Sequence, residues 1–170
     1  MKSLVKLINM LNEQFDLYND WEVEIEINKA ITALLKEYCK QTLGLTREYE
    51  IVIADLNRNK KYGKTHGCYV DETKKVMLDR TSTGYVEYAI EHKINYLFSI
   101  VETLLHEFRH AWQYEGNMEI PKEYVRSENE ETHEKYLNQP IEVDARNWAS
   151  INSKYACEYV AANLVQYLLK

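Results

Sequence analysis

Apolar residues recur at helical spacing in four stretches of the chain, which predicts four amphipathic helices. In the stretch over residues 93–115, Val101, Leu104, Phe108 and Ala111 follow one another at intervals of three and four residues, so one side of this helix should be buried. Pro140 opens the last stretch, and the first helical position tolerates proline because the backbone N–H there has no partner within the helix. The predicted helices cover residues 3–18, 28–44, 93–115 and 140–170.

Three shorter stretches alternate apolar and polar residues, which is typical of strands. Residues 48–56 are rich in Ile and Val and predict one strand. Residues 66–70 and 75–80 flank a short polar turn, so we expect them to form a β-hairpin. Together with the helices, these strands predict an α+β fold.

The pattern is less decisive in two other stretches. Residues 21–27 alternate like a strand, yet Asp20 ahead of them is a good helix cap and acidic residues suit a first helical turn. Strand and helix therefore both remain open for this stretch. Residues 117–139 are polar and acidic, and we expect them to run irregularly over the surface.

Composition narrows the class of protein. A chain of 170 residues is long enough for one domain with a single core, so we expect one domain over residues 1–170. Asp and Glu outnumber Lys and Arg by 27 to 21, a net charge of −6, which disfavours a nucleic-acid partner. No apolar run reaches the roughly 18 residues of a membrane span, so we expect no membrane partner. The three cysteines are far apart in the sequence, which favours a reducing, cytoplasmic location.

The predicted helix over residues 93–115 carries the motif H-E-x-x-H, formed by His106, Glu107 and His110. Residues four apart lie on the same face of a helix, so both imidazoles can bind one metal ion. Glu107 lies about 100° further round the helix, beside the ion, where its carboxylate can take a proton from a water molecule. The spacing therefore predicts a hydrolytic metal site.

A hydrolytic zinc site needs a third protein ligand and keeps a fourth position open. Glu130 and His133 lie 20 and 23 residues beyond His110, in a polar segment without a regular apolar face. Glu142 lies in the first turn of the last predicted helix, whose apolar residues should hold it rigidly. We therefore favour Glu142 as the third ligand, with Glu130 and His133 as alternatives.

Here the chain resembles a known family. The element E-x-x-A-x-x-W-A that begins at Glu142, after the H-E-x-x-H at His106, is similar to elements of the ImmA/IrrE-like metallopeptidases, small zincins common in phages and mobile elements. The strand pair over residues 66–79 also resembles the pair that precedes the active-site helix of that family. The resemblance covers roughly residues 48–150. It implies a zincin-like fold, in which a small antiparallel sheet packs on a long H-E-x-x-H helix flanked by N- and C-terminal helices.

The resemblance also implies the chemistry. His106, His110 and Glu142 would hold a zinc ion (Zn2+), and Glu107 would be the general base in the hydrolysis of a protein or peptide substrate. The enzyme would act in the cytoplasm of a bacterial host. We expect the strand over residues 75–80 to be the sheet edge that holds the substrate. The residues that could stabilise the oxyanion are Tyr124, His133, Tyr136 and Arg146.

Two other functions agree with parts of the pattern. The chain could be a non-catalytic interaction protein of a phage or mobile element that keeps zinc as a structural clamp, although Glu107 would have no role there. It could also be a SprT-like protease, in which His133 would be the third ligand. Asp144 and Arg109 fall off the metal face of their helices. We expect Asp144 to be a supporting or surface group and Arg109 to form a surface salt bridge.

Overall fold

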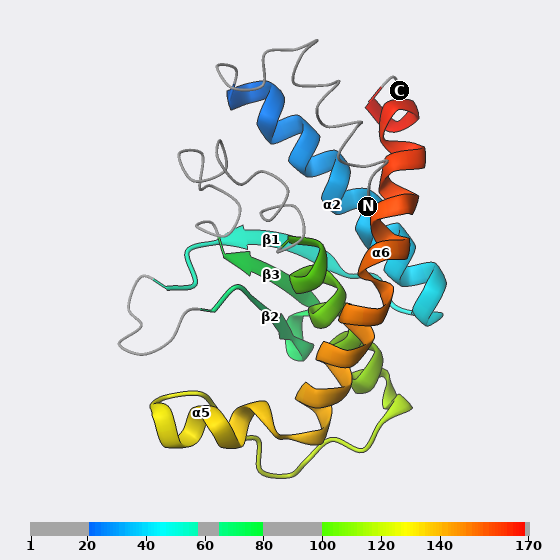
Figure 1. Cartoon of the computed structure of the whole chain (residues 1–170). Coiled ribbons are helices and arrows are strands. Elements are labelled where there is room, and N and C mark those ends of the chain that lie inside the picture. The colour runs from blue at the N-terminus through cyan, green and yellow to red at the C-terminus, as the bar shows by residue number, and fades with distance from the viewer. Residues whose placement is uncertain (1–20, 58–64, 80–99, 169–170) are drawn as a thin grey trace.

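Figure 1 shows the computed structural model of the chain, which describes residues 21–57, 65–79 and 100–168. These ranges hold helices and one three-stranded sheet, so the α+β prediction is confirmed. The predicted helix over residues 3–18 and the first part of the one over 93–115 lie outside the described residues. None of the described helices combines the length and the apolar content needed to cross a membrane. The elements in chain order are α2 (Trp21–Leu43), β1 (Glu50–Ala54), β2 (Gly67–Val70), β3 (Lys75–Asp79), a helix over residues 100–112 (the central helix), a π-helical turn (Gln113–Asn117), α5 (Glu130–Leu137) and α6 (Pro140–Leu168).

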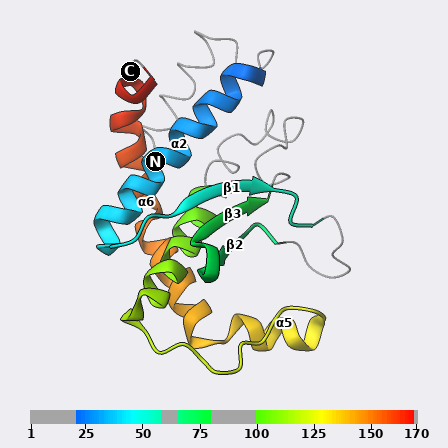
Figure 2. The ribbon, with the colours of Figure 1, turned by 180° about the vertical axis from the view of Figure 1, so that it is seen from behind.

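The sheet is mixed, with the strand order β1-β3-β2. β2 and β3 form the predicted antiparallel hairpin, whereas β1 runs parallel to β3, with Ile51 opposite Val76. The expectation of an antiparallel sheet is therefore wrong for β1, and the expectation that β3 is the sheet edge is also wrong. In this central strand Val76 and Leu78, which lie on the same face of the sheet, are 0% and 1% exposed. Within the described part of the chain β2 pairs on one side only, as the view from behind shows (Figure 2).

α2 includes the stretch that the pattern left open. Residues 21–27 are helical and continue without a break into the apolar side of the helix, where Ile31 and Leu35 are buried. The helix ends at Leu43 and is followed by Gly44, whose φ of 65° is strained for other residues. This conformation lets the N–H of Leu45 donate to the carbonyl of Lys40 at 3.1 Å, which satisfies one of the last carbonyls of the helix.

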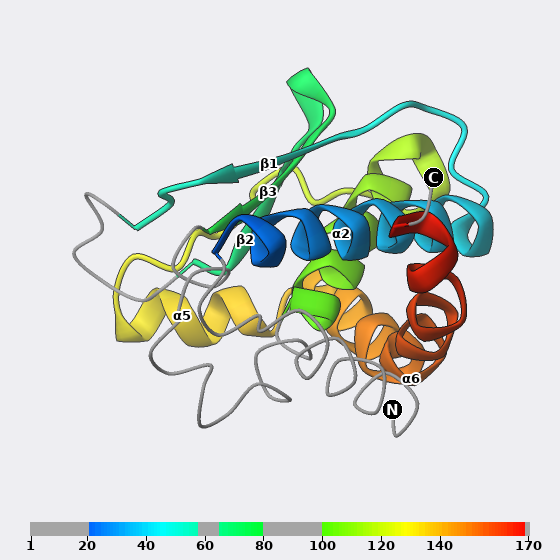
Figure 3. The same cartoon turned by 90° about the horizontal axis from the view of Figure 1, so that it is seen from above.

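The central helix lies between the sheet and α6 (Figures 1 and 3). Its predicted buried side is confirmed within the described residues, because Val101, Leu104, Phe108 and Ala111 are all 0% exposed. These side chains belong to one core cluster that also draws residues from α2, β3 and α6. The core thus fixes the central helix against its neighbours and leaves its polar side to face the start of α6.

The segment between the central helix and α6 is more ordered than predicted, because it contains α5. Asn129 caps this helix: its side chain accepts the N–H of Thr132 at 2.9 Å, and the Thr132 hydroxyl accepts the N–H of Asn129 at 2.9 Å. The sequence of α5 has no apolar periodicity, and none of its residues is buried. Its start depends on the reciprocal cap instead.

Glu115 ties the π-helical turn to the loop that follows α2. Its carboxylate accepts hydrogen bonds from the backbone N–H groups of Thr46 and Arg47, both at 3.1 Å, and from the Tyr49 hydroxyl at 2.5 Å. Burial raises the pKa of the Glu115 carboxyl, but these hydrogen bonds favour the charged form more strongly, so the pKa is lowered overall. The loop after α2 is thereby anchored at the end of the central helix.

Glu115→Gln should lower the free energy of unfolding at neutral pH by about 1–3 kcal/mol, because the N–H and O–H groups that donate to Glu115 lose a charged acceptor. Since the folded-state pKa lies below the unfolded value, Glu115 stabilises the fold above the ordinary glutamate pKa of about 4.3. This contribution is lost as the pH falls through the folded value. Urea denaturation across this range should show the difference between wild type and variant shrinking in acid. Glu119→Gln, at an exposed acid on the next segment, is the control, and an equal loss in this control would contradict the prediction.

The close approach of β2 to the central helix gives a second test. A Cβ atom at Gly67 would lie 2.6 Å from Thr103 Cγ2, which is closer than packed atoms come. Gly67→Ala should therefore cost about 1–3 kcal/mol of stability. Adding Thr103→Ser, which removes that methyl group, should restore part of the loss in thermal denaturation. Simple addition of the two single losses would show that the contact is not the cause.

Candidate metal centre

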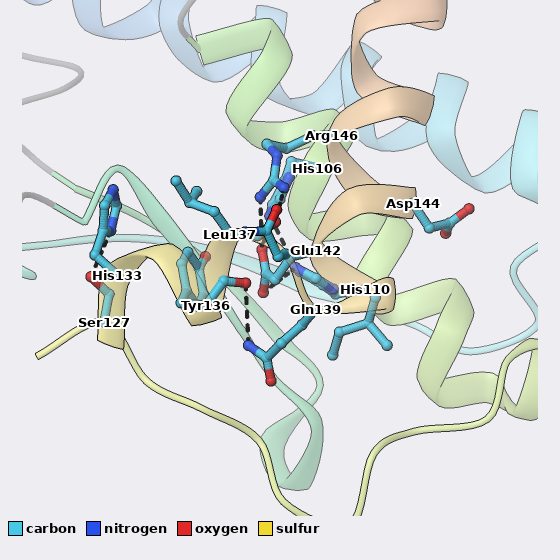
Figure 4. Close-up of polar contacts among 12 residues, drawn as sticks. His106, His110, Ser127, His133, Tyr136, Leu137, Gln139, Glu142, Asp144 and Arg146 are labelled. Carbon is cyan, nitrogen blue, oxygen red and sulfur yellow. Dashed lines mark hydrogen bonds and ion pairs between the residues drawn. The ribbon is translucent and has the colours of Figure 1, made fainter. Parts of the chain in front are cut away.

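The three side chains predicted to hold a metal ion lie together between the central helix and α6 (Figure 4). His106 and His110 project from successive turns of the central helix, and their Nε2 atoms are 3.0 Å apart. The Glu142 carboxylate comes from the first turn of α6. Its Oε2 is 3.2 Å from His106 Nε2, and its Oε1 is 3.4 Å from His110 Nε2. Among the described residues, this is the one group of three or more His, Cys, Asp or Glu side chains close enough to share an ion.

The spacing and the burial of these atoms fit a zinc ion. Ligand atoms about 2.1 Å from zinc at tetrahedral angles are about 3.4 Å apart, and the three separations here run from 3.0 to 3.4 Å. Glu142 is 1% exposed, and its Oε2 is buried without a hydrogen-bond partner. A buried carboxylate oxygen without a partner is costly, and a cation supplies the missing interaction.

Gln113 orients one of the two imidazoles. Its amide nitrogen donates to the carbonyl of Ile141 at 2.9 Å and to Asp144 Oδ2 at 2.8 Å, so its amide oxygen must face His110 Nδ1, 2.8 Å away. Because that oxygen only accepts, we assign the proton of neutral His110 to Nδ1, which leaves the lone pair of Nε2 directed at the centre. The sequence placed Gln113 on the same helix face as the histidines, three residues after His110. Its contacts with Ile141 and Asp144 could not be predicted, because they depend on where α6 packs.

Asp144 and Arg109 link the same two helices. Arg109 donates to both carboxylate oxygens of Asp144, at 2.7 and 3.1 Å, and its guanidinium lies 3.6 Å from the centre of the Trp112 ring. The predicted Arg109 salt bridge is therefore present, but its position at the surface is wrong, since the Arg109 side chain is only 15% exposed. Asp144 contacts Gln113, which in turn contacts His110, a position compatible with the predicted supporting group.

Glu107 is buried beside the three candidate ligands. It is 5% exposed, and its side chain packs against the backbone of β2 at Gly67, where a Cβ would lie 3.0 Å from Glu107 Cγ. The backbone N–H of Tyr69 donates to the Glu107 carboxyl. Burial raises the pKa of this carboxyl, although the nearby imidazoles of His106 and His110 oppose the shift.

The candidate ligands also change one another's charge. Burial alone would raise the pKa of Glu142, but the two imidazoles beside it hold that pKa well below its usual range. Burial alone would lower the pKa of His110, but the carboxylates of Glu142 and Glu107 raise it overall. A cation at the centre is therefore favoured by the same negative charges that favour protonated histidine.

Three of the four residues named for oxyanion stabilisation surround Glu142. The Tyr124 hydroxyl donates to Glu142 Oε1 at 2.8 Å. The Tyr136 hydroxyl interacts with Glu142 as well and is close enough to Glu107 for that charge to raise its pKa, after burial and Glu142 itself. Arg146 lies 3.9 Å from Glu142 Oε2 and donates to the carbonyl of Leu137.

The two alternative third ligands lie elsewhere. Glu130 and His133 are exposed residues of α5, and neither belongs to the ligand group found among the described residues. His133 Nδ1 is 2.8 Å from Ser127 Oγ, and Figure 4 shows this pair apart from His106 and Glu142. The difference follows from packing, since the start of α6 is buried and α5 has no buried residue.

No family model matches the chain, and neither a curated protein nor a solved structure matches it at a significant level. The resemblance to the ImmA/IrrE-like metallopeptidases therefore stays a prediction from the sequence motifs, and the geometry of the site is what indicates a function.

Proposed function

We propose that the chain is a zinc-dependent metallopeptidase of the zincin type, with His106, His110 and Glu142 as the zinc ligands. The observation that carries the proposal is the convergence of two imidazoles from one helix and a buried carboxylate from another, with one carboxylate oxygen lacking a hydrogen-bond partner. Two neutral histidines and one carboxylate are a ligand set of hydrolytic zinc sites. Three protein ligands leave a position for water, which hydrolysis requires.

The residues around the centre can share the work of peptide hydrolysis. A zinc ion held there supplies a Lewis acid that lowers the pKa of a water molecule from about 15.7 toward about 7. Glu107, buried beside the histidines, accepts a proton from the attacking water and passes it to the leaving amine. The Tyr136 hydroxyl is close enough to Glu142 and Glu107 for both charges to raise its pKa, so Tyr136 is our candidate to donate to the oxyanion.

The sheet edge favours a peptide as the substrate. Within the described residues β2 pairs only with β3, and its Tyr69 N–H reaches Glu107. An extended peptide that adds to this edge would therefore pass beside Glu107, with backbone hydrogen bonds supplying its affinity. The substrate-binding strand that we propose is β2, in place of the β3 segment expected from the sequence.

The two alternative functions have less support. A structural zinc site gives Glu107 no role. Burying this carboxyl, which is only 5% exposed, costs free energy because it loses its contact with water. A SprT-like site needs His133 as a ligand, and His133 lies on α5 against Ser127. A relationship to the ImmA/IrrE-like metallopeptidases remains part of our proposal, supported by the position of Glu142 in the first turn of α6.

The purified protein should bind about one zinc ion per chain, and Glu142→Ala should weaken that binding by several kcal/mol. The variant removes both a ligand atom and the negative charge that offsets the ion. Competition with a chromophoric chelator measures the affinity. Glu130→Ala and His133→Ala are the matched controls and should bind zinc like the wild type. Loss of zinc from either control while Glu142→Ala keeps it would overturn the ligand assignment.

Glu107→Gln should keep its zinc but cleave peptides about 10²–10⁴-fold more slowly, since an amide cannot accept the proton of the attacking water. A library of quenched fluorescent peptides reports cleavage, and metal analysis of the same samples reports zinc. Glu102→Gln changes an exposed acid of the same helix and should leave both measurements unchanged. If zinc-loaded Glu107→Gln cleaves at the wild-type rate, another group is the base.

A further inference from the structure

The two oxygens of the Glu142 carboxylate have different surroundings. Oε1 accepts a hydrogen bond from the Tyr124 hydroxyl at 2.8 Å. Oε2 is buried, lies 3.2 Å from His106 Nε2 and has no hydrogen-bond partner. One oxygen is therefore held by the protein, while the other is left for an ion.

Hydrogen bonds from the Gln139 side chain to the backbone of the next residue, Val125, hold Tyr124 in this position. Residues 118–128 contain no helix or strand, so the segment depends on side chains to hold it. Gln139, which is 8% exposed, accepts the N–H of Val125 at 2.9 Å and donates to the carbonyl of Val125 at 3.0 Å. The Tyr136 ring packs edge-on against Tyr124, with 6.1 Å between the ring centres.

Tyr124 is not a core residue, although its hydroxyl contacts a buried side chain. The residue is 41% exposed, yet its hydroxyl reaches a glutamate that is 1% exposed. A half-exposed tyrosine adds less hydrophobic stabilisation than a tyrosine in the core does. The contact with Glu142 is thus the main interaction that this side chain makes with the metal centre.

We propose that Tyr124 is a positioning residue that makes Glu142 a ligand through one oxygen only, an inference that rests on the proposed zinc site. By holding Oε1, Tyr124 presents Oε2 to the ion and keeps the fourth position open for water. Without this hydrogen bond the carboxylate can turn and bind with both oxygens, which raises the coordination number. Tyr124 acts through Glu142 and needs no contact with the substrate.

Cobalt substitution in Tyr124→Phe tests this role. Co²⁺ can replace zinc in His and carboxylate sites, and its visible absorption is strong in a four-coordinate site and weaker in a five-coordinate one. We expect a strong band in the cobalt-loaded wild type and a clearly weaker one in Tyr124→Phe. Chelator competition should show about 10-fold weaker zinc binding in the variant, as for other outer-shell partners of a ligand.

Tyr114→Phe is the matched control, because it removes the hydroxyl of a nearby half-buried tyrosine that packs on Tyr69. It should keep both the cobalt band and the zinc affinity of the wild type.

A wild-type cobalt band in Tyr124→Phe would overturn the inference and leave the zinc site standing. Weaker zinc binding with an unchanged band would also overturn it, since that is the result of a merely structural contact. A wild-type protein that binds neither metal would overturn the proposed function, and the role of Tyr124 with it.

Discussion

The burial of one carboxylate, that of Glu142, is the constraint on which the rest of the site depends. A charged carboxylate that is 1% exposed is costly unless positive or hydrogen-bonding groups surround it. The chain places His106 and His110 on one side of it and the Tyr124 hydroxyl on another. One oxygen still lacks a hydrogen bond, and a bound cation is the simplest group that would satisfy it.

This arrangement needs the central helix and the start of α6 at a fixed separation. On the apolar side, the shared core cluster holds them, with Phe108 and Ala149 among its members. On the polar side, Gln113 bonds to the backbone of Ile141, directly before Glu142, and Arg109 pairs with Asp144. The same contacts that join the helices therefore orient His110. Partly buried, multiply bonded pairs of this kind hold a geometry more firmly than exposed ion pairs do.

The sheet contributes the other side of the centre. Because Gly67 has no Cβ, β2 approaches the central helix closely enough for Glu107 to pack against its backbone. Glu107 is thereby shielded from water and lies near the two histidines and against β2, an edge strand of the described sheet. In the proposed reaction this is the position that a proton carrier must occupy, between the activated water and an extended peptide.

The sequence by itself determined what depends on local geometry. The positions of His106 and His110 on one helix face follow from the helical repeat, and the strand ranges follow from alternation. Glu142 was preferred to Glu130 and His133 because its helix has apolar residues that can be buried. The structure places Glu142 with the two histidines. Only the tertiary structure decided that β1 pairs in parallel with β3, that β2 lies at an edge of the described sheet, and that Tyr124 and Gln113 meet the candidate ligands. These features join segments far apart in the chain. Their partners are selected by packing and by the satisfaction of buried polar groups, neither of which leaves a periodic pattern in the sequence.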